Sequence, residues 1–195
     1  AVSARSTFTS FADVLKATKD KPGSVAYGTS GVGTSQHVVG EWLAKLAGVQ
    51  FLHIPYKGGG QATTDIVGGQ VPLAVLGLAP MLAQAKAGNV RIVAVTSLKR
   101  AGAIPGVPTT TELGYAQIAL TQWAGLVAPA GTPEVIVKQL SEAIFKVVSR
   151  QDVQQKLTEV GFDPKPLGHQ QFDRFLKANV DTWTRVVPGL ALKLE

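Results

Sequence analysis

Residues Gly28–His37 read GTSGVGTSQH and join a short apolar strand, Ser24–Tyr27, to an amphipathic helix, Gln36–Ala47. A strand, a glycine-rich loop and a helix in this order bring several backbone N–H groups and small hydroxyls to a helix N-terminus. Such a site holds a carboxylate or a phosphate without a cationic side chain. The stretch therefore predicts an α/β fold and an anion-binding loop.

The loop differs from the common nucleotide-binding loops at defined positions. A Walker A loop needs a lysine after its last glycine, but Thr34 follows Gly33. A dinucleotide-binding loop needs a third glycine, which the residues after Gly33 do not supply. A plain turn between strand and helix is the remaining alternative. Hydroxyl side chains among the loop glycines favour anion binding over that alternative. They are Thr29, Ser30, Thr34 and Ser35.

Strands and helices alternate on both sides of the loop, and each is recognised by its apolar pattern. The further elements expected here are strands at Phe51–Ile54, Val71–Leu76 and Arg91–Thr96, and helices at Ala62–Val67 and Pro80–Ala87. A first helix begins after Thr9 or Ser10, either of which can cap it, and the residues before it are expected to form a loop. Alternation at this spacing predicts a mainly parallel sheet with helices on both faces.

The pattern changes after Thr96. A long loop is expected first, then an extended crossover at Ile118–Val127, and then a helical tail. Thr132 is a good N-cap for the first tail helix, with Pro133 as its first residue. Two more helices are expected near Val153–Val160 and His169–Val187. The natural boundary between the two parts lies near residues 120–130.

Composition limits the classes of function. The 195 residues carry 45% hydrophobic and 16% charged side chains, which is typical of a globular protein. The net charge of +6 comes from scattered Lys and Arg, so we expect no nucleic-acid partner, which would need them gathered on one face. The lack of cysteine excludes disulfides, thiol catalysis and cysteine-based zinc sites. No apolar run approaches the ~20 residues of a membrane span.

Catalysis is a less favoured interpretation of the same loop. Ser30 or Ser35 with His37 could form a nucleophile and its base, but a nucleophile elbow needs Gly-x-Ser-x-Gly. No carboxylate lies nearby in sequence to orient the imidazole. The three histidines of the chain are dispersed and form no metal-binding pattern. We therefore expect no enzyme, no cofactor and no metal site, with a serine hydrolase as the disfavoured alternative.

A second candidate site follows the strand Phe51–Ile54. Tyr56, Lys57 and Gly58 come just after its end, where ligands bind in open α/β sheets. A surface turn with a solvated Lys57 is the equally weighted alternative. Trp123, in the extended crossover, either lines a ligand cleft or belongs to the core.

Several stretches resemble, in order, the tripartite tricarboxylate transporter substrate-binding proteins, the TctC or Bug family. They are YGTSGVGTSQHVVGEWLAKLAGVQFLHIPYKGGGQATTDIVGGQV (27–71), IVAVTSLKRAGAIPGVPTTTELGY (92–115), WAGLVAPAGTP (123–133) and the helical tail. The resemblance implies a type II periplasmic binding protein-like fold, whose two α/β lobes close over a small, usually carboxylated ligand. It also implies an extracytoplasmic, periplasmic solute-binding protein that delivers this ligand to the membrane components of a transporter.

In the family, the matching loop holds a ligand carboxylate through backbone N–H groups, hydroxyls and waters. Carried over, the resemblance implies these ligand contacts: Thr29, Ser30, Gly33, Thr34, Ser35, His37, Tyr56, Lys57 and Gly58. Gly77 and Trp123 are further ligand-binding candidates. Where the family commonly has an acidic pattern facing the cleft, this chain has Leu76 and Gly77. The replacement argues against an amino-acid ligand and favours a carboxylate with an apolar or aromatic body.

Family members carry roughly the first third of their length before the region that this chain matches. The resemblance therefore implies an N-terminally truncated form. Residues 1–124 are then one near-complete ligand-binding lobe, and residues 125–195 are the crossover and helices of the other, incomplete lobe. The apolar stripes of those helices would be exposed in a monomer, so we expect a homodimer or an exchange of elements between copies. The rival function is a ligand-sensing domain of a regulatory system with the same fold.

Overall fold

The computed structural model describes residues 1–190 and 192. They form two compact units, Ala1–Gln122 together with Leu190 and Leu192, and Trp123–Gly189. The division expected from the sequence, 1–124 and 125–195, ends in residues that lie outside the described ones (191 and 193–195). Its assignment to two lobes of one fold stays a prediction.

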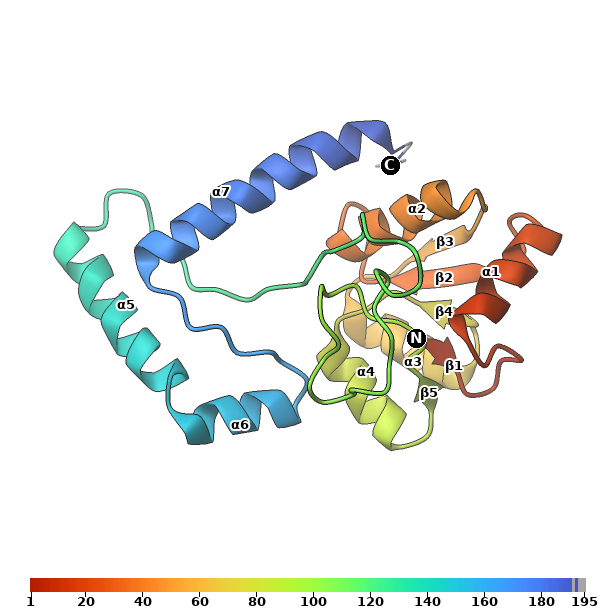
Figure 1. The fold of residues 1–195 in the computed structure, drawn as a ribbon, viewed down its shortest axis with the longest axis horizontal. Helices are drawn as coiled ribbons and strands as arrows, with labels where there is room; N and C mark the ends of the chain where they lie inside the picture. Colours follow the sequence, from red (N-terminus) through yellow and green to blue (C-terminus); the bar gives the residue numbers. More distant parts are fainter. Residues whose placement is uncertain (191, 193–195) are drawn as a thin grey trace. The chain divides into compact units, whose positions relative to one another are not determined.

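The first unit is built on a five-stranded sheet with the order β3-β2-β4-β1-β5 (Figure 1). The strands are β1 (Val2–Ser3), β2 (Ala26–Thr29), β3 (Leu52–Pro55), β4 (Leu73–Ala74) and β5 (Val90–Arg91). Strand β2 pairs in parallel with both β3 and β4, whereas β1 runs antiparallel to both β4 and β5. The sheet is therefore mixed.

The expectation of a loop before the first helix was wrong. The expected mainly parallel sheet is present, because β2, β3, β4 and β5 run in one direction and, among the described strands, only β1 runs against them. Val2 and Ser3 are fully buried and enter the sheet between β4 and β5. Two residues in a polar stretch give no apolar pattern, and their partners lie far away in sequence. The expected strands Val71–Leu76 and Arg91–Thr96 are shorter than predicted, although the Val75 N–H still donates to the Gly28 carbonyl beyond the end of β4.

Four helices belong to the first unit: α1 (Phe11–Asp20), α2 (Ser35–Ala47), α3 (Gly59–Gly68) and α4 (Leu78–Lys86). Ser10 caps α1 as one of the two predicted candidates, and Asp13 completes a capping box with it. Each helix from α2 to α4 follows one of the three parallel strands. Their N-termini therefore lie at the carboxyl ends of β2, β3 and β4.

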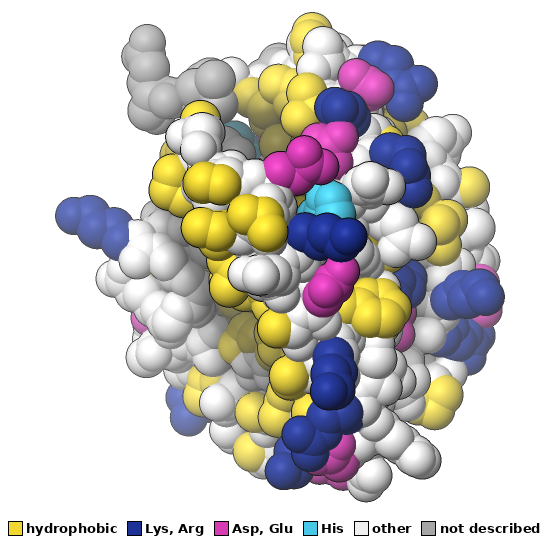
Figure 2. All heavy atoms as spheres, turned by 90° about the vertical axis from the view of Figure 1, so that its left-hand side faces the viewer, with side chains coloured by type: hydrophobic (Ala, Val, Ile, Leu, Met, Phe, Trp, Pro, Cys, Tyr) yellow, Lys and Arg dark blue, Asp and Glu magenta, His cyan; other side chains and the backbone are white. Residues whose placement is uncertain are grey.

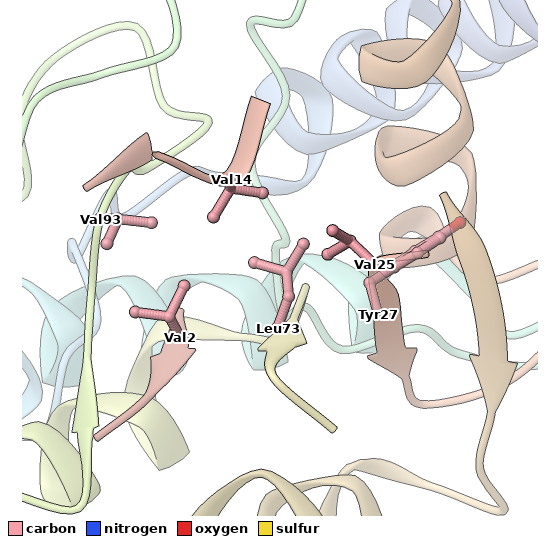
Figure 3. Close-up of a cluster of buried hydrophobic side chains, with 6 residues drawn as sticks. All are labelled: Val2, Val14, Val25, Tyr27, Leu73 and Val93. Carbon is pink, nitrogen blue, oxygen red and sulfur yellow. The ribbon is translucent and has the colours of Figure 1, made fainter. Parts of the chain in front are cut away.

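Apolar side chains fill both faces of the sheet. On one face, Val14 of α1 lies over Val2, Val25 and Leu73 of the sheet region (Figure 3). On the other face, Ile66 of α3 and Met81 of α4 pack with residues of β4 and β5. The helices thus cover both faces, as alternation of strands and helices predicts.

Helix α2 approaches the sheet very closely at Gly40. A Cβ atom there would lie 2.3 Å from the Tyr27 ring, so only glycine fits without movement of that ring. Tyr27 is 1% exposed, and its hydroxyl donates to Oε1 of Glu41 at 2.7 Å. This contact fixes α2, and with it the loop that precedes α2, against β2.

The second unit consists of helices in its described residues: α5 (Glu134–Val148), α6 (Gln151–Glu159), α7 (His169–Val186) and the short 3₁₀ helix η1 (Val187–Gly189). The three predicted tail helices are present. Thr132 does not cap α5, however, because Pro133 occupies the N-cap position and the Thr132 hydroxyl donates to the Pro129 carbonyl at 2.8 Å.

None of the residues of α5, α6 and α7 is buried. Val135 of α5 and Val180 of α7 are each 62% exposed, and Leu140 and Phe145 are also exposed. Figure 2 shows exposed hydrophobic side chains gathered in a band on the face that it presents. Among the described helices, none combines the length and the apolar character that crossing a membrane requires.

Candidate functional site

The loop between β2 and α2 has the local geometry of an anion site. Thr34 caps α2: its hydroxyl accepts the His37 N–H at 3.4 Å and donates to the Gly31 carbonyl at 2.8 Å. Gly31 and Gly33 have φ angles of +139° and +73°, which other residues rarely adopt. For the N–H groups of Ser35 and Gln36, in the first turn, no acceptor occurs among the described residues. These N–H groups are free to bind an anion.

The turn after β3 lies beside this loop. The Tyr56 N–H donates to the Thr29 carbonyl and the Gly58 N–H donates to the Ser30 carbonyl, both at 3.1 Å. A Cβ atom at Gly28 would lie 3.0 Å from the Tyr56 ring, so the ring packs against the backbone of β2. Lys57, between these two anchored residues, is exposed. It is the cationic side chain of this turn.

Tyr56 is itself held by a carboxylate of α3. Its hydroxyl donates to Oδ2 of Asp65, in α3, at 2.8 Å. Partial burial and this neighbouring carboxylate raise the pKa of Tyr56 to about 12. Tyr56 therefore stays neutral and links the turn to α3. The sequence signal for this pair is a tyrosine just before a helix and an aspartate nine residues later, inside that helix.

Gly77 is connected to the loop by the amide side chains of Gln122 and Gln36. A Cβ atom at Gly77 would lie 2.6 Å from Oε1 of Gln122, and that oxygen accepts from Nε2 of Gln36 at 3.4 Å. The Ser30 hydroxyl donates to Oε1 of Gln36. The amide side chains of Gln36 and Gln122 were not predicted. Gln122 follows a long irregular stretch, and no local pattern marks it.

Two histidines lie beneath the loop. The rings of His37 and His53 stack at 3.9 Å with an angle of 7° between them. The Gly33 N–H donates to Nδ1 of His37 at 3.1 Å, and Nε2 of His53 lies 2.7 Å from Oγ1 of Thr29. Burial lowers the pKa of His37 despite the nearby Glu41 carboxylate; burial and the neighbouring His37 lower the pKa of His53 to about 4. Both rings are neutral at pH 7.

These contacts alter the expected roles of Thr29 and His37. Thr29 is fully buried and His37 is 3% exposed. The polar side-chain atoms described above face the loop, not the solvent. We therefore expect Thr29 and His37 to act on a ligand through the loop backbone.

The geometry disfavours nucleophilic catalysis by the loop serines. The Ser30 hydroxyl donates to Gln36, and Nδ1 of His37 is occupied by the Gly33 N–H. A nucleophile would need its hydroxyl within hydrogen-bond reach of the imidazole. In the described part of the chain, no cluster of three or more metal-ligating side chains occurs.

The structure thus brings most of the predicted site residues to the carboxyl end of the parallel strands. They are Ser30, Gly33, Thr34, Ser35, Tyr56, Lys57, Gly58 and Gly77. Trp123 belongs to the second unit, where its ring meets Phe172 and Phe175 of α7 edge-on at 5.6 and 5.7 Å. Its role in ligand binding stays a prediction.

Comparison with known proteins connects this site to a family. Residues 1–192 match the family TctC, described as "Tripartite tricarboxylate transporter family receptor". The chain is 32% identical over 187 residues to the UPF0065 protein in the tcbD-tcbE intergenic region of Pseudomonas sp. (strain P51), covering 95% of this chain and 56% of that protein. The chain therefore spans about half the length of this curated relative.

Two solved structures resemble the whole chain. R. palustris Rpa4515, solved with adipate, has a TM-score of 0.92 at 29% identity, covering 97% of this chain and 64% of that one. The periplasmic binding protein BugD has a TM-score of 0.84 at 25% identity, covering 98% and 65%. The fold is thus the α/β fold of periplasmic binding proteins, and the proteins that share it here bind substrates and are not enzymes. The chain belongs to the TctC family of tripartite tricarboxylate transporter receptors.

Proposed function

We propose that this chain is part of a periplasmic solute-binding protein that captures a small organic carboxylate. The observation that carries the proposal is the first turn of α2, where the N–H groups of Ser35 and Gln36 have no acceptor among the described residues. A carboxylate there would accept hydrogen bonds from both groups and lie at the positive end of the helix dipole. Lys57, exposed on the adjacent turn, adds a positive charge.

Two more helices begin at the carboxyl end of the same parallel strands. Gly58 and Gly77 precede α3 and α4, and neither helix has a side-chain cap on its first N–H groups. Three helix N-termini lie at the carboxyl ends of three parallel strands, and together they favour binding of a negatively charged group there. A ligand with more than one carboxylate could bind to more than one of these helix N-termini.

The ligand we favour has an apolar body between its carboxylates. Leu76 and Gly77 follow β4. The Leu76 side chain is apolar and Gly77 has none, so neither supplies a side-chain group that could bind an ammonium group. The related R. palustris protein was solved with adipate, a dicarboxylate with an apolar chain. The ammonium group of an amino acid would be repelled by Lys57 and by the three positive helix N-termini at this end of the strands.

Delivery to the membrane components of a tripartite tricarboxylate-type transporter is the proposed biological step. Binding proteins of this fold close around a ligand, and the closed form is favoured by contacts that only that form makes. The family to which the chain belongs supports this step. A ligand-sensing role in a regulatory system remains the alternative, and the presence of a DNA-binding or signalling domain in the same polypeptide would favour it.

A titration with adipate tests the binding proposal. We expect adipate to shift the NMR signals of the Ser35 and Gln36 amides in a saturable way, because its carboxylate would accept from both. Adipamide, its neutral diamide, is the matched control and should shift neither signal. Aspartate should bind more weakly than adipate. Equal effects of adipate and adipamide would show that these amides are not an anion site.

We also infer that the exposed apolar face of the second unit is covered in solution by a second copy of the chain. Helices α5, α6 and α7 bury none of their residues, although each has an apolar stripe. Exposed patches of this kind mark association surfaces. Light scattering should report a dimer, and Leu140→Glu, which places a charge on α5, should shift the mass to that of a monomer. A monomeric wild-type mass would contradict this inference.

A further inference from the structure

The stacked histidines connect two secondary-structure elements under the candidate loop. His37 comes from the first turn of α2 and His53 from β3, where it is paired in register with Tyr27 of β2. The Tyr27 ring lies 4.9 Å from the His53 ring, and His53 lies 3.9 Å from His37. The three rings therefore join β2, β3 and α2 directly below the loop.

Each imidazole is connected to one of the two positive-φ glycines of the loop. His37 accepts the Gly33 N–H at Nδ1, at 3.1 Å. His53 reaches Gly31 through Thr29: its Nε2 lies 2.7 Å from the Thr29 hydroxyl oxygen, which accepts the Gly31 N–H at 3.2 Å. The two glycines carry the unusual backbone angles of the loop. Gly33 is thus supported by the buried His37, and Gly31 by the buried Thr29 with the half-buried His53 behind it.

We propose that His37 and His53 are positioning residues of the carboxylate-binding loop, which hold Gly33 and Gly31 so that the loop and the first turn of α2 direct their N–H groups at the ligand. This assignment rests on the proposed function. We expect neither ring to contact the ligand, because His37 is buried and Nε2 of His53 is engaged by the Thr29 hydroxyl. The residues act through the backbone, as supporting side chains do in preorganised sites.

The contact between His37 and Gly33 requires a neutral His37 ring. Nδ1 of His37 accepts a hydrogen bond only when its proton is on Nε2, and a proton on Nδ1 would face the Gly33 N–H. A charge on one ring also disfavours a charge on the other at 3.9 Å. The titratable groups that face the pair are Tyr27 of β2, whose hydroxyl donates to Glu41, and Glu41 of α2.

Acid should therefore release the loop. Because burial lowers the pKa of both imidazoles, the unfolded chain binds protons more readily than the folded one. The stabilisation from the neutral pair is complete above the ordinary histidine pKa of about 6.5. It is lost as the pH falls from there toward about 4, the pKa of His53 in the folded protein.

Two substitutions at His53 separate positioning from simple packing. His53→Phe keeps an aromatic ring for stacking but removes the nitrogen that contacts Thr29. His53→Gln keeps a polar nitrogen near the Nε2 position. We expect His53→Phe to speed hydrogen exchange at the Gly31 and Gly33 amides about tenfold and to weaken adipate binding about tenfold, the effect of losing one polar contact. His53→Gln should restore both toward the wild-type values.

The two readouts distinguish the failure of this inference from the failure of the proposed function. If wild-type protein does not bind adipate, the proposed carboxylate ligand is contradicted, but exchange at Gly31 and Gly33 in the free protein still tests positioning. Unchanged exchange at both glycines in folded His53→Phe would overturn the inference. So would a His53→Gln variant that behaves like His53→Phe.

A pH titration of the wild-type protein gives a second test that needs no variant, should His53→Phe not fold. The imidazole nitrogen signals and the Gly31 and Gly33 amide signals should change together below pH about 6.5. If the Gly31 and Gly33 amide signals do not change while the imidazoles become protonated, the inference is refuted. His37→Asn, which keeps an acceptor oxygen near the Nδ1 position, should leave the Gly33 amide protected.

Discussion

Gly33→Ala is expected to weaken adipate binding by about tenfold or more, because the loop can no longer keep its backbone angles. An L-residue at φ +73° costs about 1–2 kcal/mol, and the loop can relieve this strain by turning the residue to a negative φ. That rotation withdraws the Gly33 N–H from His37 and redirects the N–H groups that follow it. Calorimetry or an NMR titration measures the affinity.

Gly23→Ala is the matched control for this experiment. Gly23 has a φ of +74°, nearly that of Gly33, and a Cβ atom there would meet no atom within 4 Å. It precedes β2, at the opposite end of the strand from the loop. We expect the two variants to lose similar stability, and only Gly33→Ala to lose affinity. An equal loss of affinity in both would mean that the loop geometry has no specific role.

The second large effect is expected at Tyr27. Tyr27→Ala should lower the free energy of unfolding by about 3–5 kcal/mol, the usual cost of removing a buried aromatic ring. The ring fills the close contact with Gly40 and also meets Phe51 at 5.8 Å and His53 at 4.9 Å. Because small domains are stable by only about 5–15 kcal/mol, this loss is a large fraction of the total.

Tyr27→Phe separates the ring from its hydroxyl. It keeps the packing but removes the bond to Glu41, so we expect a loss of about 1 kcal/mol. Urea unfolding followed by circular dichroism measures both variants. An alanine variant no less stable than the phenylalanine variant would show that the ring does not fix α2 to the sheet.

Local signals in the sequence predicted what depends on neighbouring residues. Ser10 caps α1 because its side chain and that of Asp13 act within one turn, and the pattern is visible in four residues. The loop before α2 was predicted for the same reason, since its glycines, hydroxyls and helix start are contiguous. Tyr56 became a candidate, beside the alternative of a plain surface turn, because it follows a strand end where ligands bind in open α/β sheets.

Features that depend on register and distant pairing were not predicted. The contact between His37 and His53 exists because β2 and β3 pair with Tyr27 opposite His53, and sequence spacing does not reveal that register. Strand β1 consists of two residues and has no period to detect. Gln122 reaches Gln36 across 86 residues of sequence, after a stretch without regular structure.

The position of β1 has a consequence for the order of folding. Strands β2 and β3 are separated by one helix and can meet early, whereas β1 must wait for β4 and β5. The Ala1 nitrogen donates to the Ala74 carbonyl across 73 residues of sequence. Contacts between such distant segments form slowly, because a long stretch of chain must be closed before they contribute. We therefore expect insertion of β1 to be a late, rate-limiting event that completes the sheet around an already formed β2–α2–β3 nucleus.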